Sequence, residues 1–133
     1  MKKIFLFFII LVQVINALEI SDIEDLDKAC SKGEAEACFK IGNFYHPKAI
    51  AKNNKEAAIY YHKACDMNHG KACNNLGNLY KNGHGVQQDY QMALELFAKA
   101  CEIEDSMEKG CTNKEKLIEL MKDLNETKVN SFS

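Results

Sequence analysis

The chain has 133 residues, with 17 lysines, no arginine and 19 acidic residues, and its formal net charge at pH 7 is −2. Nucleic-acid binding requires a basic surface and commonly uses arginine to hold phosphates and guanine, so this composition excludes that class of function. One proline, no tryptophan and no long alternation of β-branched residues after the amino terminus predict an all-α protein.

The amino terminus has the organisation of a secretory signal. Two lysines follow Met1, an apolar run extends from Ile4 to Val12, and small residues end at Ala17. This order is typical of a signal peptide over residues 1–17, and we expect cleavage after Ala17. The alternative is a membrane anchor, but the run breaks at Gln13 and is shorter than the roughly 20 apolar residues that a span needs. We therefore expect no membrane span after signal removal.

A cysteine frame recurs through the rest of the chain. Its members are two cysteines eight residues apart in the first two copies and ten apart in the third: Cys30 and Cys38, Cys65 and Cys73, Cys101 and Cys111. The copies follow one another at 35 and 36 residues. A period of roughly 20 to 50 residues with one apolar face per unit indicates a solenoid, in which each helix pair packs only against its neighbours.

The recurring cysteine frame also predicts where the helices and repeats begin and end. We predict a stapled repeat domain over residues 18–125: a first helix over 21–32, repeats over about 34–68 and 70–104, and a capping helix over about 107–124, before a frayed tail over 126–133. Small residues at matching positions are expected to let helix backbones approach closely: Gly42, Gly77, Ala57, Ala93, Ala64 and Ala100.

Local signals agree with these boundaries. Ser21, Asn53 and Asp89 are expected to cap the starts of helices. Gly33 and Asn68 follow helices at equivalent places, where a left-handed residue is expected. A turn at either residue brings the two cysteines of a pair within bonding range.

The repeat therefore favours three short disulfides, Cys30 with Cys38, Cys65 with Cys73 and Cys101 with Cys111, formed in an oxidising compartment. A zinc site at His62, Cys65 and His69 is the alternative, but it competes with Cys73 for Cys65. Without a Cys-x-x-Cys pair, redox catalysis has little support. We predict structural disulfides, with no metal and no cofactor.

The second repeat contains Leu76-Gly-Asn-Leu-Tyr80, Gly83-His-Gly-Val86 and Lys99-Ala-Cys101, and in this it resembles the Sel-one-like repeat, a relative of the tetratricopeptide repeat. The first repeat lacks the Gly-x-Gly-Val loop. With a cysteine pair in each unit and a signal in front, the chain resembles the Helicobacter cysteine-rich protein family over roughly residues 20–125. This resemblance implies a secreted or periplasmic bacterial protein that binds β-lactams such as penicillin and hydrolyses them slowly. We expect a monomer.

The sequence shows no complete set of catalytic residues for the implied β-lactam hydrolysis. Ser106 and Lys109 match the Ser-x-x-Lys motif of serine β-lactamases, but the accompanying Ser-Asp-Asn and Lys-Thr-Gly motifs are absent. The alternative for Ser106 is a solvated loop leading into the last helix. The four histidines lack zinc-ligand spacing and are expected mainly in loops or on the surface. Hydrolase activity therefore rests on resemblance alone.

The repeat gives more support to a ligand-binding function than to a hydrolase function. In related repeats the first helix of each unit lines a concave groove that holds an extended peptide. Polar residues fall at the matching positions, with Asn74 beside them: Lys40, Asn43, Asn75 and Asn78. The alternative is a solvated helix face. The ligands considered are a β-lactam, a peptidoglycan-like peptide and a protein partner. A structural spacer or host-interacting antigen would need no groove.

The tail contains one further motif. Asp123-Leu-Asn125-Glu-Thr127 matches the extended acidic sequon of some bacterial N-glycosylation systems, which makes Asn125 a glycosylation candidate.

Overall fold

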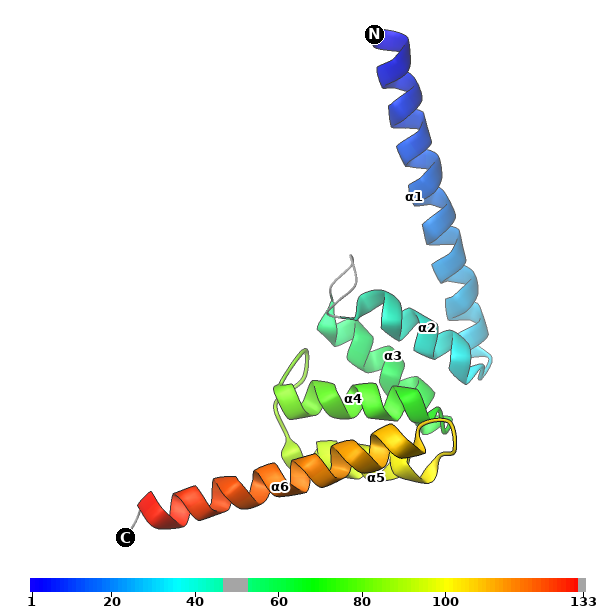
Figure 1. Cartoon of the computed structure of the whole chain (residues 1–133). Coiled ribbons are helices and arrows are strands. Elements are labelled where there is room, and N and C mark those ends of the chain that lie inside the picture. Colours follow the sequence, from blue (N-terminus) through cyan, green and yellow to red (C-terminus); the bar gives the residue numbers. More distant parts are fainter. Residues whose placement is uncertain (47–52, 132–133) are drawn as a thin grey trace.

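The computed structural model describes residues 1–46 and 53–131, without the side chains of residues 15–20. These ranges contain six α-helices and no strand (Figure 1): α1 (Lys2–Ser31), α2 (Ala35–Tyr45), α3 (Asn54–Asp66), α4 (Gly70–Asn82), α5 (Tyr90–Glu102) and α6 (Met107–Ser131). The predicted all-α fold is confirmed.

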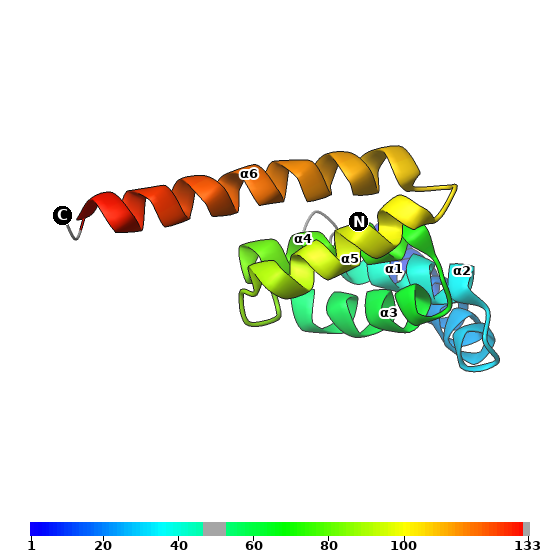
Figure 2. The same ribbon diagram turned by 90° about the horizontal axis from the view of Figure 1, so that it is seen from below.

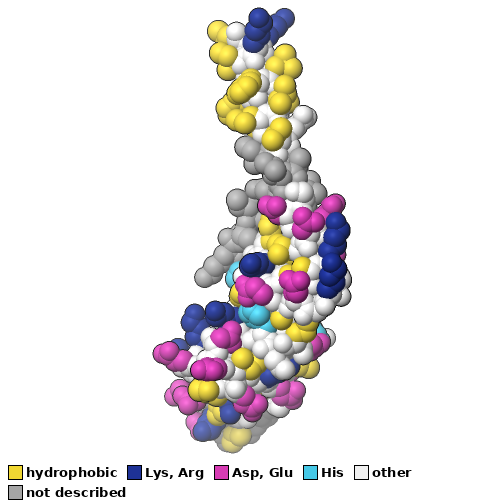
Figure 3. All heavy atoms as spheres, turned by 90° about the vertical axis from the view of Figure 1, so that its right-hand side faces the viewer, with side chains coloured by type: hydrophobic (Ala, Val, Ile, Leu, Met, Phe, Trp, Pro, Cys, Tyr) yellow, Lys and Arg dark blue, Asp and Glu magenta, His cyan; other side chains and the backbone are white. Residues whose placement is uncertain are grey.

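Each helix packs mainly against its neighbours in the chain, which is the arrangement of an α/α solenoid. Helices α2 and α3 form the first repeat, and α4 and α5 form the second. Helix α6 crosses the second repeat, and its carboxy-terminal part extends beyond the body (Figures 1 and 2). The start of α1 projects away at the other end. Figure 3 shows its apolar side chains below a tip of lysines.

Glycines at matching positions bring the two helices of each repeat together. A Cβ on Gly42 would lie 2.5 Å from the ring of Tyr61, and a Cβ on Gly77 would lie 2.7 Å from the ring of Phe97. Both rings are fully buried. The predicted close approach at these glycines is therefore confirmed, since a larger residue would overlap the ring that fills the repeat's core.

Caps and turns hold the predicted boundaries of the repeats. Asn53 Oδ1 accepts a hydrogen bond from the Glu56 amide at 3.3 Å, and Asp89 Oδ1 accepts one from the Met92 amide at 2.9 Å. Asn68 takes a φ of 59°, which confirms its left-handed turn. Gly33, with a φ of 95°, makes the equivalent turn between α1 and α2.

Two boundaries differ from the sequence prediction. The first helix does not begin at Ser21, because α1 runs unbroken from Lys2, and residues 2–20 contain no proline or glycine to end it. The proposed cleavage point at Ala17 falls where the structure describes no side chains. At the other end, α6 continues to Ser131 instead of fraying after Asn125. None of the described helices is long and apolar enough to cross a membrane.

Helix α6 closes the solenoid. Leu117 is buried against Phe97 and Ala93 of α5. Counting from the cysteines, Glu115 occupies the position of Gly42 and Gly77. A carboxylate there would keep another helix from packing as closely as α5 packs on α4, so α6 differs from α2 and α4 at this position.

Candidate functional site

Three disulfides tie each repeat to the next element. They join α1 to α2, α3 to α4 and α5 to α6, with Cα–Cα distances of 4.8 Å for Cys30–Cys38, 4.7 Å for Cys65–Cys73 and 4.6 Å for Cys101–Cys111. This is one disulfide for each copy of the cysteine frame. No cysteine is left as a free thiol.

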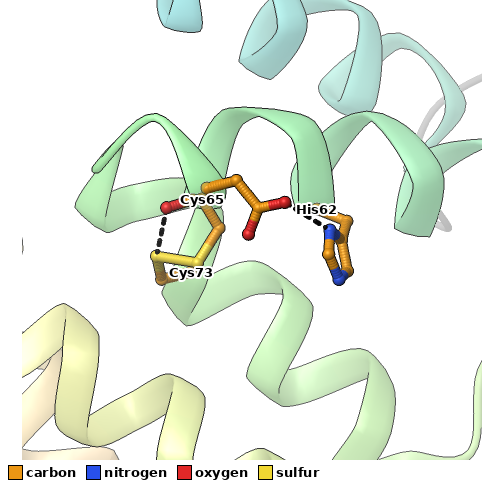
Figure 4. Close-up of polar contacts among 4 residues, drawn as sticks. His62, Cys65 and Cys73 are labelled. Atoms are coloured by element: carbon orange, nitrogen blue, oxygen red, sulfur yellow. Dashed lines mark hydrogen bonds and ion pairs between the residues drawn. A yellow bond between two sulfur atoms is a disulfide. The ribbon is translucent and has the colours of Figure 1, made fainter.

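Figure 4 shows why the zinc alternative fails at the second disulfide. Cys65 is bonded to Cys73, whose sulfur lies 3.6 Å from the Cys65 carbonyl oxygen, while His62 Nδ1 lies 3.0 Å from Asp66 Oδ2. His69 belongs to a different cluster, described below. Within residues 1–46 and 53–131, no three side chains are grouped to hold a metal ion.

A cavity of about 440 Å³ opens between the start of α4 and the segment that leads from α5 into α6. Its lining residues come from α2, α4, the α5–α6 connection and the start of α6: Phe39, Lys71, Asn74, Asn75, Glu104, Asp105, Ser106, Met107, Glu108 and Lys109. The third cysteine pair is ten residues apart instead of eight, and the residues between Cys101 and Cys111 supply one wall of the cavity.

Backbone contacts fix that wall. The buried Ser106 hydroxyl donates to the carbonyl oxygen of Ala100 at 2.8 Å and lies 3.3 Å from that of Ile103. Gly70, at the start of α4, leaves room for Ser106, because a Cβ on Gly70 would overlap the serine side chain. The cavity wall is therefore packed directly on α4.

Two asparagines of α4 form the floor. Asn74, which is 8% exposed, accepts a hydrogen bond at Oδ1 from Asn113 Nδ2 at 2.8 Å, and this bond ties α6 to α4. Asn75 hydrogen-bonds the Tyr61 hydroxyl, which in turn donates to Asn43 Oδ1 at 2.8 Å. These bonds leave Asn75 only part of its amide for a ligand.

On one side of the cavity, the ring of Phe39 packs against His69. Phe39 stacks on His69, with ring centroids 4.4 Å apart. His69 Nδ1 accepts from the Ala72 amide at 3.3 Å and thereby caps α4, so Nε2 carries the proton and donates to Glu36 Oε2 at 2.9 Å. The His69 side chain is only 10% exposed. His69 lies in the connection between α3 and α4, as expected of a loop histidine, but its ring is packed instead of exposed.

Charges of both signs surround the opening. Lys71 and Lys109 line the cavity together with the acidic residues Glu104, Asp105 and Glu108. The face of the repeats visible in Figure 3 likewise carries both signs, without a large patch of either. The opening therefore offers partners for positively and negatively charged groups of a ligand.

Burial also raises the pKa values of two tyrosines of α3, Tyr60 and Tyr61. Burial raises the pKa of Tyr61 to about 12, against a small opposing effect of the hydrogen bond from Asn75. The pKa of Tyr60 is also raised to about 12, first by burial and then by its hydrogen bond to Asp27 at 2.8 Å. Both hydroxyls therefore stay neutral donors at physiological pH.

The five residues of the predicted groove lie on α2 and α4, in different surroundings. Asn74 and Asn75 line the cavity, but Lys40 lies in a separate shallow hollow beside Asp22 and Asp25 of α1. Asn43 is held by Tyr61. Asn78 occupies the equivalent position in the second repeat, where Phe97 offers no hydroxyl, and its side chain makes no hydrogen bond within the described ranges. Asn43 and Asn75 thus meet at the Tyr61 hydroxyl, while Lys40 and Asn78 have other surroundings.

Ser106 and Lys109 do line the same cavity, yet their roles differ from the predicted motif. The Ser106 hydroxyl donates to backbone, and in the described structure it has no hydrogen bond to the exposed Lys109. Asn125 is exposed on α6, and its sequon is helical, with Thr127 Oγ1 donating to the Leu124 carbonyl at 3.0 Å.

Sequence reasoning missed the rest of the lining, namely Phe39, Lys71, Glu104, Asp105, Met107 and Glu108. The signal that could have found the acidic wall is the longer spacing of the third cysteine pair. It places extra chain at one end of the repeats, next to α4.

Comparisons with known proteins agree with this architecture. Residues 35–69 and 70–105, more than half of the chain, match the Sel1 repeat model. The chain is similar to the crystal structure of a Sel1 repeat protein from Oxalobacter formigenes (37% identity, TM-score 0.58, covering 62% of this chain and 35% of that one). It is also similar to c5321, a protective antigen present in uropathogenic Escherichia coli strains that displays an SLR fold (29% identity, TM-score 0.64, covering 80% and 23%).

The chain thus spans about a third and a quarter of the length of these two proteins. A comparison with curated proteins finds no match.

Proposed function

The chain belongs to the Sel1 repeat family, and from this premise we propose that it is a non-catalytic binding module that holds a polypeptide segment in the cavity between α4 and the α5–α6 connection. The observation that carries the proposal is the lining of this cavity. Amide groups, both signs of charge and one aromatic ring converge on about 440 Å³ of open space. Those are the groups that recognise the backbone and side chains of a peptide.

Each wall has a distinct role in this proposal. Asn75 offers amide hydrogen bonds to a peptide group, and Phe39 provides an apolar surface held in place by His69. Lys71 on α4 pairs with a carboxylate of the ligand, while Glu104 and Asp105 pair with an amino group. Since the walls are fixed by Ser106 and by a disulfide, little ordering is required on binding.

We place this module outside the cytoplasm, with residues 1–17 removed as a signal. Three disulfides within one small helical domain support an oxidising compartment, because cytosolic thiols are kept reduced. The binding partner is then a peptide or protein of the cell envelope or of the surroundings.

The β-lactamase interpretation does not gain the same support. Neither related structure is described as a β-lactam-binding protein. The hydroxyl of the serine that matched the nucleophile motif is 5% exposed and donates to the Ala100 carbonyl. A nucleophilic serine requires a base that accepts its proton, and Ser106 has a carbonyl oxygen there instead.

A peptide-display selection tests the proposal. The purified, oxidised protein is used to select from a phage library of random 12-residue peptides, and the affinity of the selected peptides is measured by calorimetry. Lys71→Glu should weaken the selected peptides by roughly tenfold or more, since it reverses a charge on the cavity wall. Lys116→Glu, an exposed lysine of α6 that does not line the cavity, is the matched control.

Two results would contradict the proposal. One is a library that yields no peptide above background. The other is a set of peptides whose affinity is equal for the protein and for Lys71→Glu, which would place binding on another surface.

A further inference from the structure

A second hollow lies between the first and the second repeat and shares no lining residue with the cavity described above. It has a volume of about 470 Å³ and is formed by α3, α4 and the loop after α4. Its lining residues are Lys55, Ala58, Ile59, His62, Lys63, Leu76, Tyr80, Gly85 and Val86. The floor is apolar, with Ala58 and Leu76 almost fully buried.

Ile59 is a large apolar residue on the exposed side of α3. Its side chain is 49% exposed at the hollow. Counted from the cysteine at the end of each helix, the same position holds Glu24 in α1 and Glu95 in α5, and both are exposed. The fold therefore accepts a charged residue at this position, and packing within the chain does not require the isoleucine.

The rim of the hollow is basic. Lys55, Lys63 and His62 line it, and no carboxylate is among the described residues that do so. His62 pairs with Asp66 on the same helix, as Figure 4 shows, and the Lys63 ammonium lies 4.8 Å from the centre of the Tyr60 ring. Lys55 makes no ion pair in the described ranges. A positive rim thus stands on a chain whose net charge is negative.

We infer that this hollow is a second docking site, and that its partner is an acidic protein segment with an apolar side chain between its carboxylates. The apolar side chain covers Ile59 and the floor formed by Ala58 and Leu76, while the flanking carboxylates pair with Lys55 and Lys63. Apolar contact at the centre with charges at the rim is the usual arrangement of a protein interface.

A defined peptide tests this assignment. The probe is a fluorescein-labelled peptide, Gly-Ser-Glu-Glu-Leu-Phe-Glu-Glu-Ser-Gly, and its binding to the purified, oxidised protein is measured by fluorescence anisotropy. The first control peptide has lysine in place of each glutamate. Because the whole chain is negatively charged, unspecific attraction favours the lysine peptide, and only a local basic site favours the acidic one.

Variants then locate the site. Ile59→Glu introduces the residue of the other two helices, so the variant should fold and lose about tenfold or more in affinity. Lys55→Glu should reduce the affinity several-fold and flatten its salt dependence. Lys116→Glu, which lines neither cavity, should leave the affinity for the acidic probe unchanged. Lys71→Glu separates this site from the proposed function, since an affinity that falls in Lys71→Glu and not in Ile59→Glu would place the probe in the first cavity and overturn the inference.

The inference is overturned if the lysine peptide binds as tightly as the acidic one. It is also overturned if Ile59→Glu keeps its helical circular dichroism and binds the acidic peptide with unchanged affinity.

Discussion

Replacing Cys65 and Cys73 together by alanine removes the disulfide between α3 and α4, at the centre of the solenoid. The cysteines are eight residues apart, and in the chain-entropy model closing a loop of that size contributes roughly 2.5 kcal/mol to the free energy of unfolding. Both side chains are buried, at 2% and 0% exposure, so the alanines also leave small voids that cost about 1 kcal/mol. The double variant should therefore be less stable by roughly 3 to 4 kcal/mol.

The assay is thermal unfolding followed by circular dichroism at neutral pH. A loss of that size corresponds to a decrease in Tm of about 10 to 15 °C for a domain of this length. The matched control replaces Cys101 and Cys111, which close a loop of similar size but are only half-buried. It should lose less, because its voids are smaller. If the central variant melts within about 3 °C of the unmodified protein, the disulfide is not a main source of stability and the reasoning is wrong.

Further predictions concern packing, the serine and the tyrosines. Gly77→Ala places a methyl group 2.7 Å from the Phe97 ring, so the overpacking cost of about 1 to 3 kcal/mol should exceed the gain in helix propensity of about 1 kcal/mol and lower the Tm; a higher Tm would refute the close packing. Ser106→Ala should lose about 1 kcal/mol of stability, because the Ala100 carbonyl loses one of its two donors, while both proteins turn over a chromogenic cephalosporin no faster than a boiled and reduced sample; turnover that depends on Ser106 would restore the enzyme interpretation. The raised pKa of Tyr61, about 12 against 10.0, means that the folded state favours the neutral phenol, so its contribution to stability is complete below pH 10 and lost as the pH rises towards about 12. Phenolate absorbance should show that Tyr60 and Tyr61 titrate near pH 12, and their complete ionisation near pH 10 would contradict their burial.

The repeats were predictable because their signals are local. A cysteine eight residues after another, with Gly33 or Asn68 between them, encodes two helices and the turn that joins them. Gly42 and Gly77 recur at one frame position because each faces a buried ring. Such residues report contacts that every repeat makes, so comparing the chain with itself is enough to find them.

The ends of the chain and the cavity were harder to predict. Ser21 has the features of a cap, but a cap forms only where the helix begins, and nothing upstream interrupts α1. The cavity forms once, from residues of α2, α4 and the α5–α6 connection, so the repeat cannot reveal it. Its closest sequence signal is the longer third cysteine spacing, and that spacing does not say that Ser106 packs on Gly70.

The surroundings of the predicted groove residues could not be read from their positions in the repeat. Matching frame positions in α2 and α4 do not give matching surroundings, because the partner side chains differ. Asn43 meets the Tyr61 hydroxyl, whereas Asn78 faces a repeat in which Phe97 has none. Lys40 lies near the acidic residues Asp22 and Asp25 of α1, whereas Asn75 at the equivalent position bonds Tyr61 of α3.

The most direct test of the central claim is the mapping of a selected peptide on the protein by NMR. Backbone amide shifts of the isotope-labelled, oxidised protein are recorded as a peptide from the display library is added. Peptide binding in the cavity predicts that the largest changes occur at Phe39, Lys71, Asn75 and residues 104–109. Changes confined to other surfaces, with these amides unaffected, would contradict the proposed binding site.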